Sequence, residues 1–423
     1  MQTNTNTQAV VADDAPLSSH SPAPVPAAVA PQARGAWLAV LSIAVGAFAL
    51  VTTEFLPVGL LPSIAAELGV TEGVAGLMVT IPGLVGALAA ILVTVGIGKT
   101  DRRYAIWGLT ATLIVSNLIV ALSHSFPLVL FGRALLGVGV GGFWAIGPAL
   151  GTRLVPGASA TKATSLIFAG VSVGTVAGVP AGAMIGELVG WRMAFHAAGA
   201  VALLVLLTQM WLLPRLPATQ ALTFRQLPEL LRVKKARLGI IVTLLIFVGQ
   251  FAGYTYITPF LSQITQLSAS TIGALLLTYG AAGFVGNLVG GWAVSKSVRR
   301  SLIATGLILG LSAAALPLLG TGLLGATALI IIWGLAFGMM PISVQTWIFQ
   351  AAPHAMESGG AVFVATAQIS LASGALVGGL AVDHLGVSSA MIVGGLFALA
   401  MASVIAYFGE EDDKPAIKLH AVH

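Results

Sequence analysis

Long apolar stretches separated by short polar segments dominate the chain. An α-helix rises 1.5 Å per residue, so about 20 consecutive apolar residues cross the hydrocarbon core of a bilayer. The pattern predicts twelve such helices, six on each side of a polar stretch from Pro214 to Arg237. Their approximate limits are 36–62, 73–97, 104–122, 127–150, 162–186, 192–213, 238–260, 271–294, 301–319, 323–349, 359–382 and 388–408. We therefore expect an all-α membrane protein.

Composition supports this fold class. Hydrophobic residues make up 57% of the chain and charged residues 8%, whereas a soluble domain carries about 25% charged residues. The 51 glycines suit closely packed membrane helices, and the lack of cysteine excludes disulfides and thiolate metal sites. The net charge of +5 comes from basic residues in short loops between the apolar stretches. That placement indicates membrane topology and argues against a nucleic-acid partner.

The basic residues also predict the orientation of the chain. With the N-terminus in the cytoplasm, most lysines and arginines fall in cytoplasmic loops, and only Arg133 and Arg192 lie toward the outside. The opposite orientation would reverse this asymmetry. We expect a multi-pass protein of the bacterial inner membrane with both termini in the cytoplasm.

The N-terminal segment resembles a tail and not a signal peptide. It is rich in alanine and proline and has no lysine or arginine before Arg34, so it lacks the basic start and apolar run of a secretory signal. The predicted organisation is a disordered cytoplasmic tail at 1–33, a six-helix bundle at 34–213, a cytoplasmic linker at 214–237, a second six-helix bundle at 238–408 and a cytoplasmic tail at 409–423.

The two predicted bundles resemble each other in sequence. GIGKTDRR at 96–103 follows the second helix, and GGWAVSKSVRR at 290–300 follows the eighth. Parallel repeats of this kind predict a pseudo-two-fold relation between the bundles and a binding cavity between them at the bilayer midplane. The alternative is that any short cytoplasmic loop is basic.

The loop at 96–103 resembles the signature of the major facilitator superfamily between its second and third helices. In that family the aspartate lies at a helix terminus and contacts the other half of the protein. The resemblance therefore implies a gating role for Asp101, Arg102 and Arg103. A loop that is merely solvated by its charges is the alternative interpretation.

Glycines recur every four residues in the fifth predicted helix and resemble the antiporter pattern of the same superfamily. The departure is that Pro180 does not directly follow Gly178. Small residues along one stripe let two helices approach closely, so we expect helix packing here, and ordinary membrane packing also explains the stripe. Its residues are Gly174, Gly178, Pro180, Gly182 and Gly186.

Further segments are similar to the purine ribonucleoside efflux pumps, within the drug:proton antiporter branch of that superfamily. They include Glu54-Phe-Leu-Pro, GRALLGVGVGGFWA at 132–145 and Gly249-Gln-Phe-Ala. The resemblance runs from about residue 36 to about residue 400 and is most specific over the first seven helices. It implies the major facilitator fold and export of purine ribonucleosides such as inosine and guanosine, driven by proton entry.

Glu54 is a carboxylate within the first apolar stretch, although the chain has only 14 acidic residues and the others fall in predicted tails, loops or helix ends. An ionised acid at bilayer depth costs roughly 2.5–3.5 kcal/mol on insertion scales, so such residues are usually functional. The fourth helix enters the bilayer from outside, and its residue Arg133 lies at a depth similar to that of Glu54. Burial favours the neutral form of a carboxyl group and a nearby cation favours the ionised form. We expect Glu54 to carry the proton with Arg133 as its electrostatic partner; a structural acid and an arginine that extends to the surface are the alternatives.

Substrate contacts are expected on helices one, four, seven and ten, which line the cavity in the major facilitator arrangement. A purine offers a flat face for stacking and edges for hydrogen bonds, which aromatic and glutamine side chains suit. Gln250 and Tyr254 are four residues apart and share a helix face. Tryptophan in membrane helices more often faces lipid or packs in the core, which is the alternative. The candidate residues are Thr53, Phe143, Trp144, Gln250, Tyr254, Gln345 and Trp347.

The sequence excludes several other classes of function. It has no Walker-type phosphate loop, no histidine-rich metal spacing and no catalytic triad pattern, so we expect neither an enzyme nor a cofactor or metal site. The predicted function is proton-coupled efflux of purine ribonucleosides, with efflux of sugars or lipophilic drugs as the alternative. The expected partners are a small-molecule substrate, protons and the lipid bilayer, and we expect a monomer.

Overall fold

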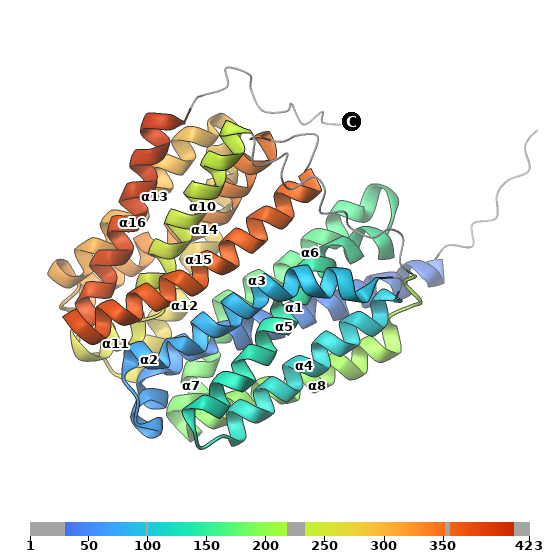
Figure 1. Ribbon diagram of the computed structural model, residues 1–423, viewed down its shortest axis with the longest axis horizontal. Coiled ribbons are helices and arrows are strands. Elements are labelled where there is room, and N and C mark those ends of the chain that lie inside the picture. The colour runs from blue at the N-terminus through green and yellow to red at the C-terminus, as the bar shows by residue number, and fades with distance from the viewer. Residues whose placement is uncertain (1–29, 99, 218–232, 352–355, 410–423) are drawn as a thin grey trace, which may run out of the picture.

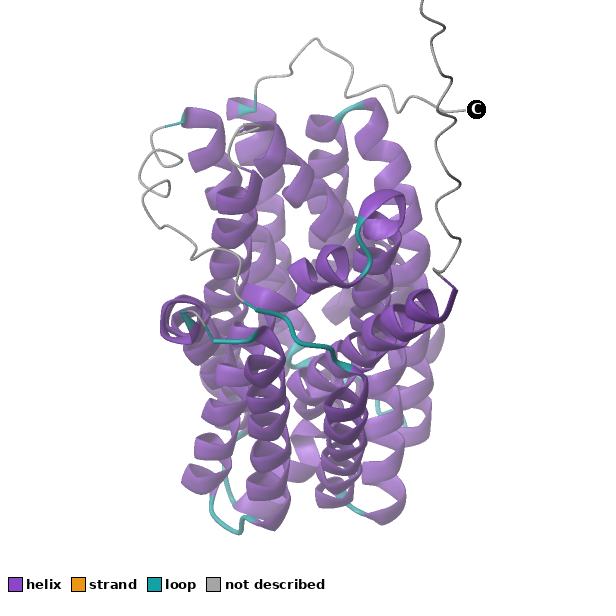
Figure 2. Ribbon diagram, turned by 90° about the vertical axis from the view of Figure 1, so that its right-hand side faces the viewer, coloured by secondary structure: helices purple, strands orange, loops and turns teal. Residues whose placement is uncertain are grey.

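The computed structural model describes residues 30–98, 100–217, 233–351 and 356–409. The predicted tail up to residue 29, linker residues 218–232 and C-terminal residues 410–423 lie outside the described part. Helices make up nearly all of the described chain, which contains no strand (Figure 2). Twelve helical segments in it are long and apolar enough to cross a membrane. The predicted all-α class and the twelve predicted spans are confirmed.

The first six spans are built from one run of helices. α1 continues through Pro57 and Pro62 to Leu68, beyond its predicted end. The fifth span contains a π-helical turn, η2, between α6 and α7. The helices are α1 (Ala30–Leu68), α2 (Glu72–Ala75), α3 (Leu77–Ile97), α4 (Arg102–Leu122), α5 (Phe126–Leu154), η1 (Gly157–Ser159), α6 (Ala160–Val173), η2 (Gly174–Gly178), α7 (Val179–Val189) and α8 (Trp191–Leu212).

The second six spans run from α10 to α16. The seventh span breaks at Thr255 and Tyr256, between α10 and α11. The helices are α10 (Lys234–Tyr254), α11 (Ile257–Gln263), α12 (Ala269–Lys296), α13 (Val298–Leu319), α14 (Leu323–Ala351), α15 (Met356–Leu385) and α16 (Val387–Phe408).

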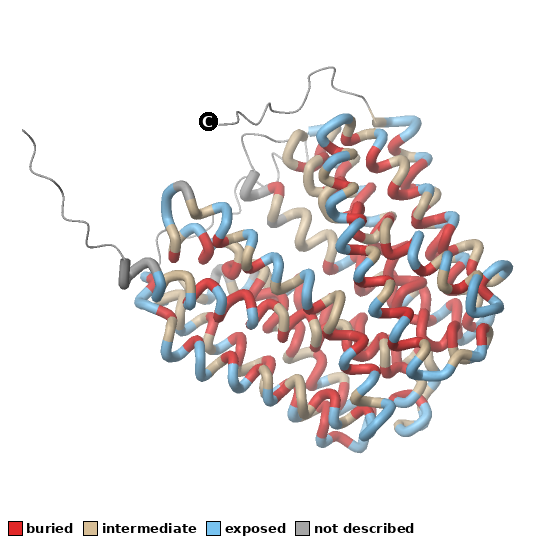
Figure 3. Tube along the Cα trace, turned by 180° about the vertical axis from the view of Figure 1, so that it is seen from behind, coloured by how far each residue is buried: buried red, intermediate tan, exposed pale blue. Residues whose placement is uncertain are grey.

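The helices form two bundles, which we call the first bundle (α1 to α8) and the second bundle (α10 to α16). The two groups occupy separate parts of the molecule (Figure 1). Two clusters of buried apolar residues belong to the first bundle alone, and a third draws mainly on the second. Buried positions follow the helix faces turned toward neighbouring helices, and exposed positions cover the outer faces (Figure 3). The boundaries of the bundles along the chain stay a prediction.

The same glycine contact occurs in both bundles. A Cβ on Gly141 of α5 would collide with the carbonyl oxygen of Gly86 on α3. A Cβ on Gly338 of α14 would collide with the carbonyl oxygen of Gly283 on α12. Both members of the second pair lie 197 positions after their counterparts in the first. This recurrence supports the predicted pseudo-two-fold repeat.

The glycine stripe of the fifth span lies against α1. A Cβ on Gly174 would lie 2.9 Å from the carbonyl oxygen of Phe48, and one on Gly178 would collide with the Thr52 side chain. Gly182 and Gly186 face the next two turns of α1 in the same way, and Pro180 is buried at the start of α7. Only residues without a side chain allow this approach along four successive turns.

The two bundles meet toward one end of the molecule. Contacts between them join α1 to α11, α2 and α3 to α15, and α7 to α12. We call the end that carries α2, α11 and the turn between α15 and α16 the closed end, and the ribbons of the two bundles diverge from it (Figure 1). The basic residues predict that the opposite end faces the cytoplasm.

Candidate functional site

Arg133 lies fully buried in α5, where its guanidinium group holds two neighbouring helices of the first bundle. Nε donates to the carbonyl oxygen of Met78 at 2.7 Å. Nη1 donates to the carbonyl oxygen of Thr53, and Nη2 to that of Glu54, each at 2.7 Å. Arg133 therefore bonds to the backbone of α1 and α3, and not to the carboxylate of Glu54.

Two prolines explain why these carbonyl groups need a side-chain donor. In an α-helix, a carbonyl oxygen accepts from the amide four residues later, and proline has no amide hydrogen. Pro57 therefore leaves the carbonyl of Thr53 without a donor, and Pro82 does the same to Met78. Arg133 supplies both missing hydrogen bonds, which satisfies groups that would otherwise be costly to bury.

Glu54 is buried, with 4% of its surface exposed, and its carboxylate faces the second bundle. Its Oε1 accepts a hydrogen bond from Nε2 of Gln368 on α15 at 3.4 Å. Gln368 is itself 7% exposed and packs where α15 crosses Gly83 and Gly86 of α3. The buried carboxylate therefore lies at the contact between the two bundles.

Thr53 belongs to the same buried polar region. Its hydroxyl accepts from Nδ2 of Asn117 on α4 at 3.3 Å, and Asn117 also donates to the carbonyl of Leu113 at 3.0 Å. Oδ1 of Asn117 is a buried acceptor without a partner among the described residues. Thr53 thus sits beside Arg133 and Glu54, next to an acceptor that can take a further hydrogen bond.

Gln250 and Tyr254 lie in a buried aromatic cluster inside the second bundle. Nε2 of Gln250 donates to the Tyr279 hydroxyl at 2.7 Å, and its Oε1 accepts from Nε1 of Trp333 at 2.8 Å. The ring of Tyr254 stacks on that of Tyr279 with centroids 4.8 Å apart, and Phe337 stacks on Tyr279 at 5.6 Å. We call Gln250, Tyr254, Tyr279, Trp333 and Phe337 the aromatic cluster.

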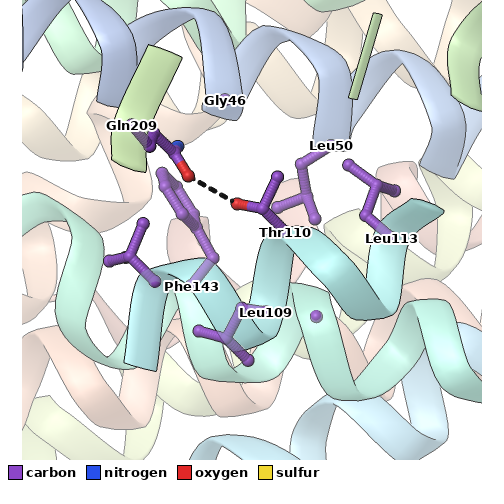
Figure 4. Close-up of a pocket in the computed structure, with 9 residues that line it drawn as sticks. Gly46, Leu50, Leu109, Thr110, Leu113, Phe143 and Gln209 are labelled. Carbon is purple, nitrogen blue, oxygen red and sulfur yellow. Dashed lines mark hydrogen bonds between the residues drawn. The ribbon is translucent and has the colours of Figure 1, made fainter. Parts of the chain in front are cut away.

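Phe143 and Trp144 face the interior of the first bundle and its fifth span. Phe143 lines a pocket enclosed by α1, α4, α5 and α8, in which Thr110 donates to Oε1 of Gln209 at 2.8 Å (Figure 4). All of the residues that line it belong to the first bundle. The ring of Trp144 lies 6.0 Å from that of Phe168 on α6. The pocket is therefore not a space between the bundles.

Gln345 and Trp347 lie near the far end of α14. Nε1 of Trp347 donates to the carbonyl oxygen of Lys235 at 3.1 Å, and the Lys235 ammonium lies 5.1 Å from the indole ring. Trp347 is buried against the start of α10, while Gln345 is half-buried. Among the residues that the structure describes, no hydrogen bond or ring contact joins Gln345 or Trp347 to the aromatic cluster.

Asp101 caps the start of α4 and contacts the segment that directly follows α8. Its Oδ1 accepts from the amides of Arg103 at 3.0 Å and Leu216 at 2.9 Å. The guanidinium of Arg103 lies over the Tyr104 ring, 4.6 Å from its centroid, and the Arg102 amide donates to the Leu216 carbonyl. The contact with the other half that the sequence resemblance implies is not among these, so the gating role stays a prediction.

Sequence reasoning did not assign Gln368 or Tyr279 to the candidate site. Gln368 carries one signal that was available, because it is an uncharged polar residue in the apolar eleventh span. Its contact with Glu54 depends on how α15 packs on α3, which no local pattern specifies.

These features define the class of protein. It has two repeated six-helix membrane bundles with buried polar groups at their junction, which is the architecture of a secondary transporter and not of an enzyme. The chain belongs to the Major Facilitator Superfamily, whose family model matches residues 43–372.

Among curated relatives, the chain is similar to the purine ribonucleoside efflux pump NepI of Escherichia coli. It is 38% identical over 372 residues to the pump of strain 536, covering 88% of this chain and 94% of the relative. It is 37% identical to the pump of strain K12 over the same shares of the two chains. Among solved structures, it resembles the human organic anion transporter MFSD10 (TETRAN), with a TM-score of 0.62 and 18% identity over 89% of this chain and 99% of that one. That likeness concerns the fold alone.

Proposed function

We propose that this transporter exports purine ribonucleosides such as inosine and guanosine in exchange for protons. The substrate class rests on the relatives at 37–38% identity, which are purine ribonucleoside efflux pumps. The coupling rests on one observation, the buried carboxylate of Glu54 at the contact with Gln368 of the other bundle.

A proton on Glu54 changes the charge at the junction between the bundles. An ionised carboxylate without a full set of partners is costly to bury, whereas the neutral acid costs much less. The two protonation states therefore favour different arrangements of α15 against α1. Arg133 contributes by fixing the backbone that carries Glu54, and its positive charge remains in the same buried region.

The aromatic cluster is the part of the second bundle best suited to a purine. Stacked tyrosine rings match the flat face of the base, and the Gln250 amide can donate and accept along its edge. In this proposal a nucleoside replaces the bonds that Gln250 makes with Tyr279 and Trp333. Thr53 lies in the buried region across the junction and offers a hydroxyl from α1.

Phe143, Trp144, Gln345 and Trp347 have weaker support as substrate contacts. Phe143 lines the internal pocket of the first bundle, and Trp347 bonds to α10 in the core of the second.

The proposed location is the bacterial inner membrane, with both termini in the cytoplasm and the protein acting as a monomer.

Inside-out membrane vesicles test the proposed function directly. Respiration acidifies their interior, so an exporter driven by protons accumulates radiolabelled inosine against its gradient. We expect Glu54→Gln to abolish this accumulation, while Glu187→Gln, which alters an exposed acid at the closed end, leaves it intact. Normal uphill accumulation by Glu54→Gln would contradict the coupling role.

Competition in the same vesicles tests the substrate class. Unlabelled purine ribonucleosides are expected to block inosine accumulation, whereas pentoses and lipophilic cations are not. Inhibition by a sugar or a lipophilic cation at the concentration at which guanosine fails would instead support the alternative substrates.

A further inference from the structure

A group of polar contacts joins the two bundles at the closed end. The Asp383 carboxylate, near the end of α15, accepts from the Thr71 hydroxyl at 2.8 Å through Oδ2. Its Oδ1 accepts from the Gly73 amide at 3.0 Å. The Thr71 oxygen in turn caps α2 by accepting from the Val74 amide at 3.1 Å. A carboxylate of the second bundle is therefore hydrogen-bonded to the start of α2 in the first bundle.

Tyr256 reinforces this junction from the break between α10 and α11. Its side chain is fully buried, and its hydroxyl donates to the carbonyl oxygen of Ala375 on α15 at 2.8 Å. The same hydroxyl lies 3.4 Å from the carbonyl oxygen of Gly73. Tyr256 thus fills the space where α10, α15 and α2 meet.

Glycines make this approach possible. A Cβ on Gly73 would collide with the carbonyl oxygen of Gly379 and with the Asp383 carboxylate. A Cβ on Gly379 would lie 2.5 Å from the Tyr256 hydroxyl, and one on Gly76 would collide with it. The backbones of α2 and α15 are therefore in direct contact, so the bundles cannot separate at this end without breaking the bonds to Asp383.

We propose that Thr71, Gly73, Tyr256 and Asp383 form a clasp that holds the bundles together at the closed end and opens in each transport cycle. The inference rests on the proposed function only in requiring that the bundles separate at this end. It does not depend on which substrate is carried.

The first bundle has a matching position that lacks this contact. Glu187 lies three residues before Gly190, as Asp383 lies three residues before Gly386, and both glycines have positive φ. Each glycine immediately precedes the next helix, α8 or α16. Glu187 is exposed, and none of the hydrogen bonds described between the bundles involves it. It therefore provides a matched control for Asp383.

The distance between the bundles at the closed end measures the state of the clasp. The chain has no cysteine, so nitroxide labels attach only at introduced positions. His124 and Thr321 are exposed loop residues at the closed end, one in each bundle. Next to His124, the carbonyl of Ser123 accepts from Arg192, which pairs with Glu67 close to Thr71 in the sequence. Next to Thr321, the carbonyl of Gly320 accepts from Thr265, just after α11. The experiment records electron–electron dipolar distances between labels at His124→Cys and Thr321→Cys in lipid nanodiscs without substrate.

We expect Asp383→Ala to raise the ratio of long to short distances by roughly tenfold or more, because two hydrogen bonds to a charged group are lost. Asp383→Asn keeps an acceptor for the Gly73 amide and is expected to give a smaller rise. Thr71→Val is a second route if Asp383→Ala fails to fold, and it is expected to raise the ratio as well.

Two results would overturn the clasp. One is a parental distance distribution in folded Asp383→Ala or, if that variant does not fold, in folded Thr71→Val. The other is an equal shift in Glu187→Ala, which would show that any lost acid at this end separates the bundles. The distance measurements use no nucleoside, so their outcome does not depend on whether the proposed substrate class is right.

Discussion

Nη1 of Arg133 donates to the carbonyl oxygen of Thr53 at 2.7 Å, and this oxygen is the one that Pro57 deprives of its helical donor. The same guanidinium bonds through Nε to Met78, the carbonyl that Pro82 leaves unpaired. One side chain thus repairs two interruptions on neighbouring helices. Its hydrogen bonds therefore go to backbone carbonyl groups and not to the carboxylate of Glu54.

Arg133→Met is expected to lower the free energy of unfolding by about 2–5 kcal/mol, because it leaves two buried carbonyl groups without donors. Thermal melting of the purified protein in detergent measures the loss. Pro57→Ala restores an amide donor for Thr53, so Arg133→Met is expected to cost less in that background. A double-mutant cycle tests this coupling; equal losses in the two backgrounds would refute it.

Glu54→Gln is expected to melt at the same temperature as the parent or higher. Glutamine keeps the shape of the side chain and can still bond to Gln368, while it removes any need to bury a charge. Together with lost accumulation in vesicles, unchanged melting would separate a functional role from a structural one. Melting well below the parent would assign a structural role to the carboxylate.

Gly141→Ala is expected to destabilise the first bundle by about 1–3 kcal/mol, because the added Cβ meets the backbone of α3 and forces the helices apart. Gly338→Ala is expected to do the same in the second bundle. Gly108→Ala is the control: a Cβ there meets nothing within 4 Å, and alanine favours the helix by up to about 1 kcal/mol. Equal melting temperatures for Gly141→Ala and Gly108→Ala would argue against this close packing.

Tyr254→Leu is expected to weaken binding of inosine to the purified protein about two- to tenfold, because the stacked ring is lost. Tyr254→Phe keeps the ring and is expected to bind like the parent. Isothermal titration calorimetry measures both. Weaker binding by Tyr254→Phe to the same extent as by Tyr254→Leu would assign the effect to the hydroxyl and not to stacking.

The hydrophobic pattern predicts the twelve spans because the bilayer sets their length, and the repeated loops predict the pairing of the bundles. Glu54 is recognisable as a lone acid in an apolar span. Pro57 and Pro82 also identify, from sequence, the two carbonyl groups that lose their donors. The sequence does not identify Arg133 as the donor to both carbonyl groups, because that depends on how α1, α3 and α5 pack.

Prolines also mark the two breaks within spans. By the rule that applies to Pro57, Pro180 leaves the carbonyl of Val176 in the π-helical turn η2 without its helical donor, and Pro259 does the same to Thr255 at the end of α10. The partners of Gln250 are instead set by tertiary packing, since Tyr279 and Trp333 lie on two other spans.

The bonds of Arg133 also have a consequence for the proposed proton coupling. They fix the main chain at Thr53 and Glu54 to α3 and α5, so this acid keeps its place within its own bundle. In the proposed mechanism, the main chain that carries Glu54 moves with the first bundle, and a displacement of α15 changes the distance between this carboxylate and Gln368.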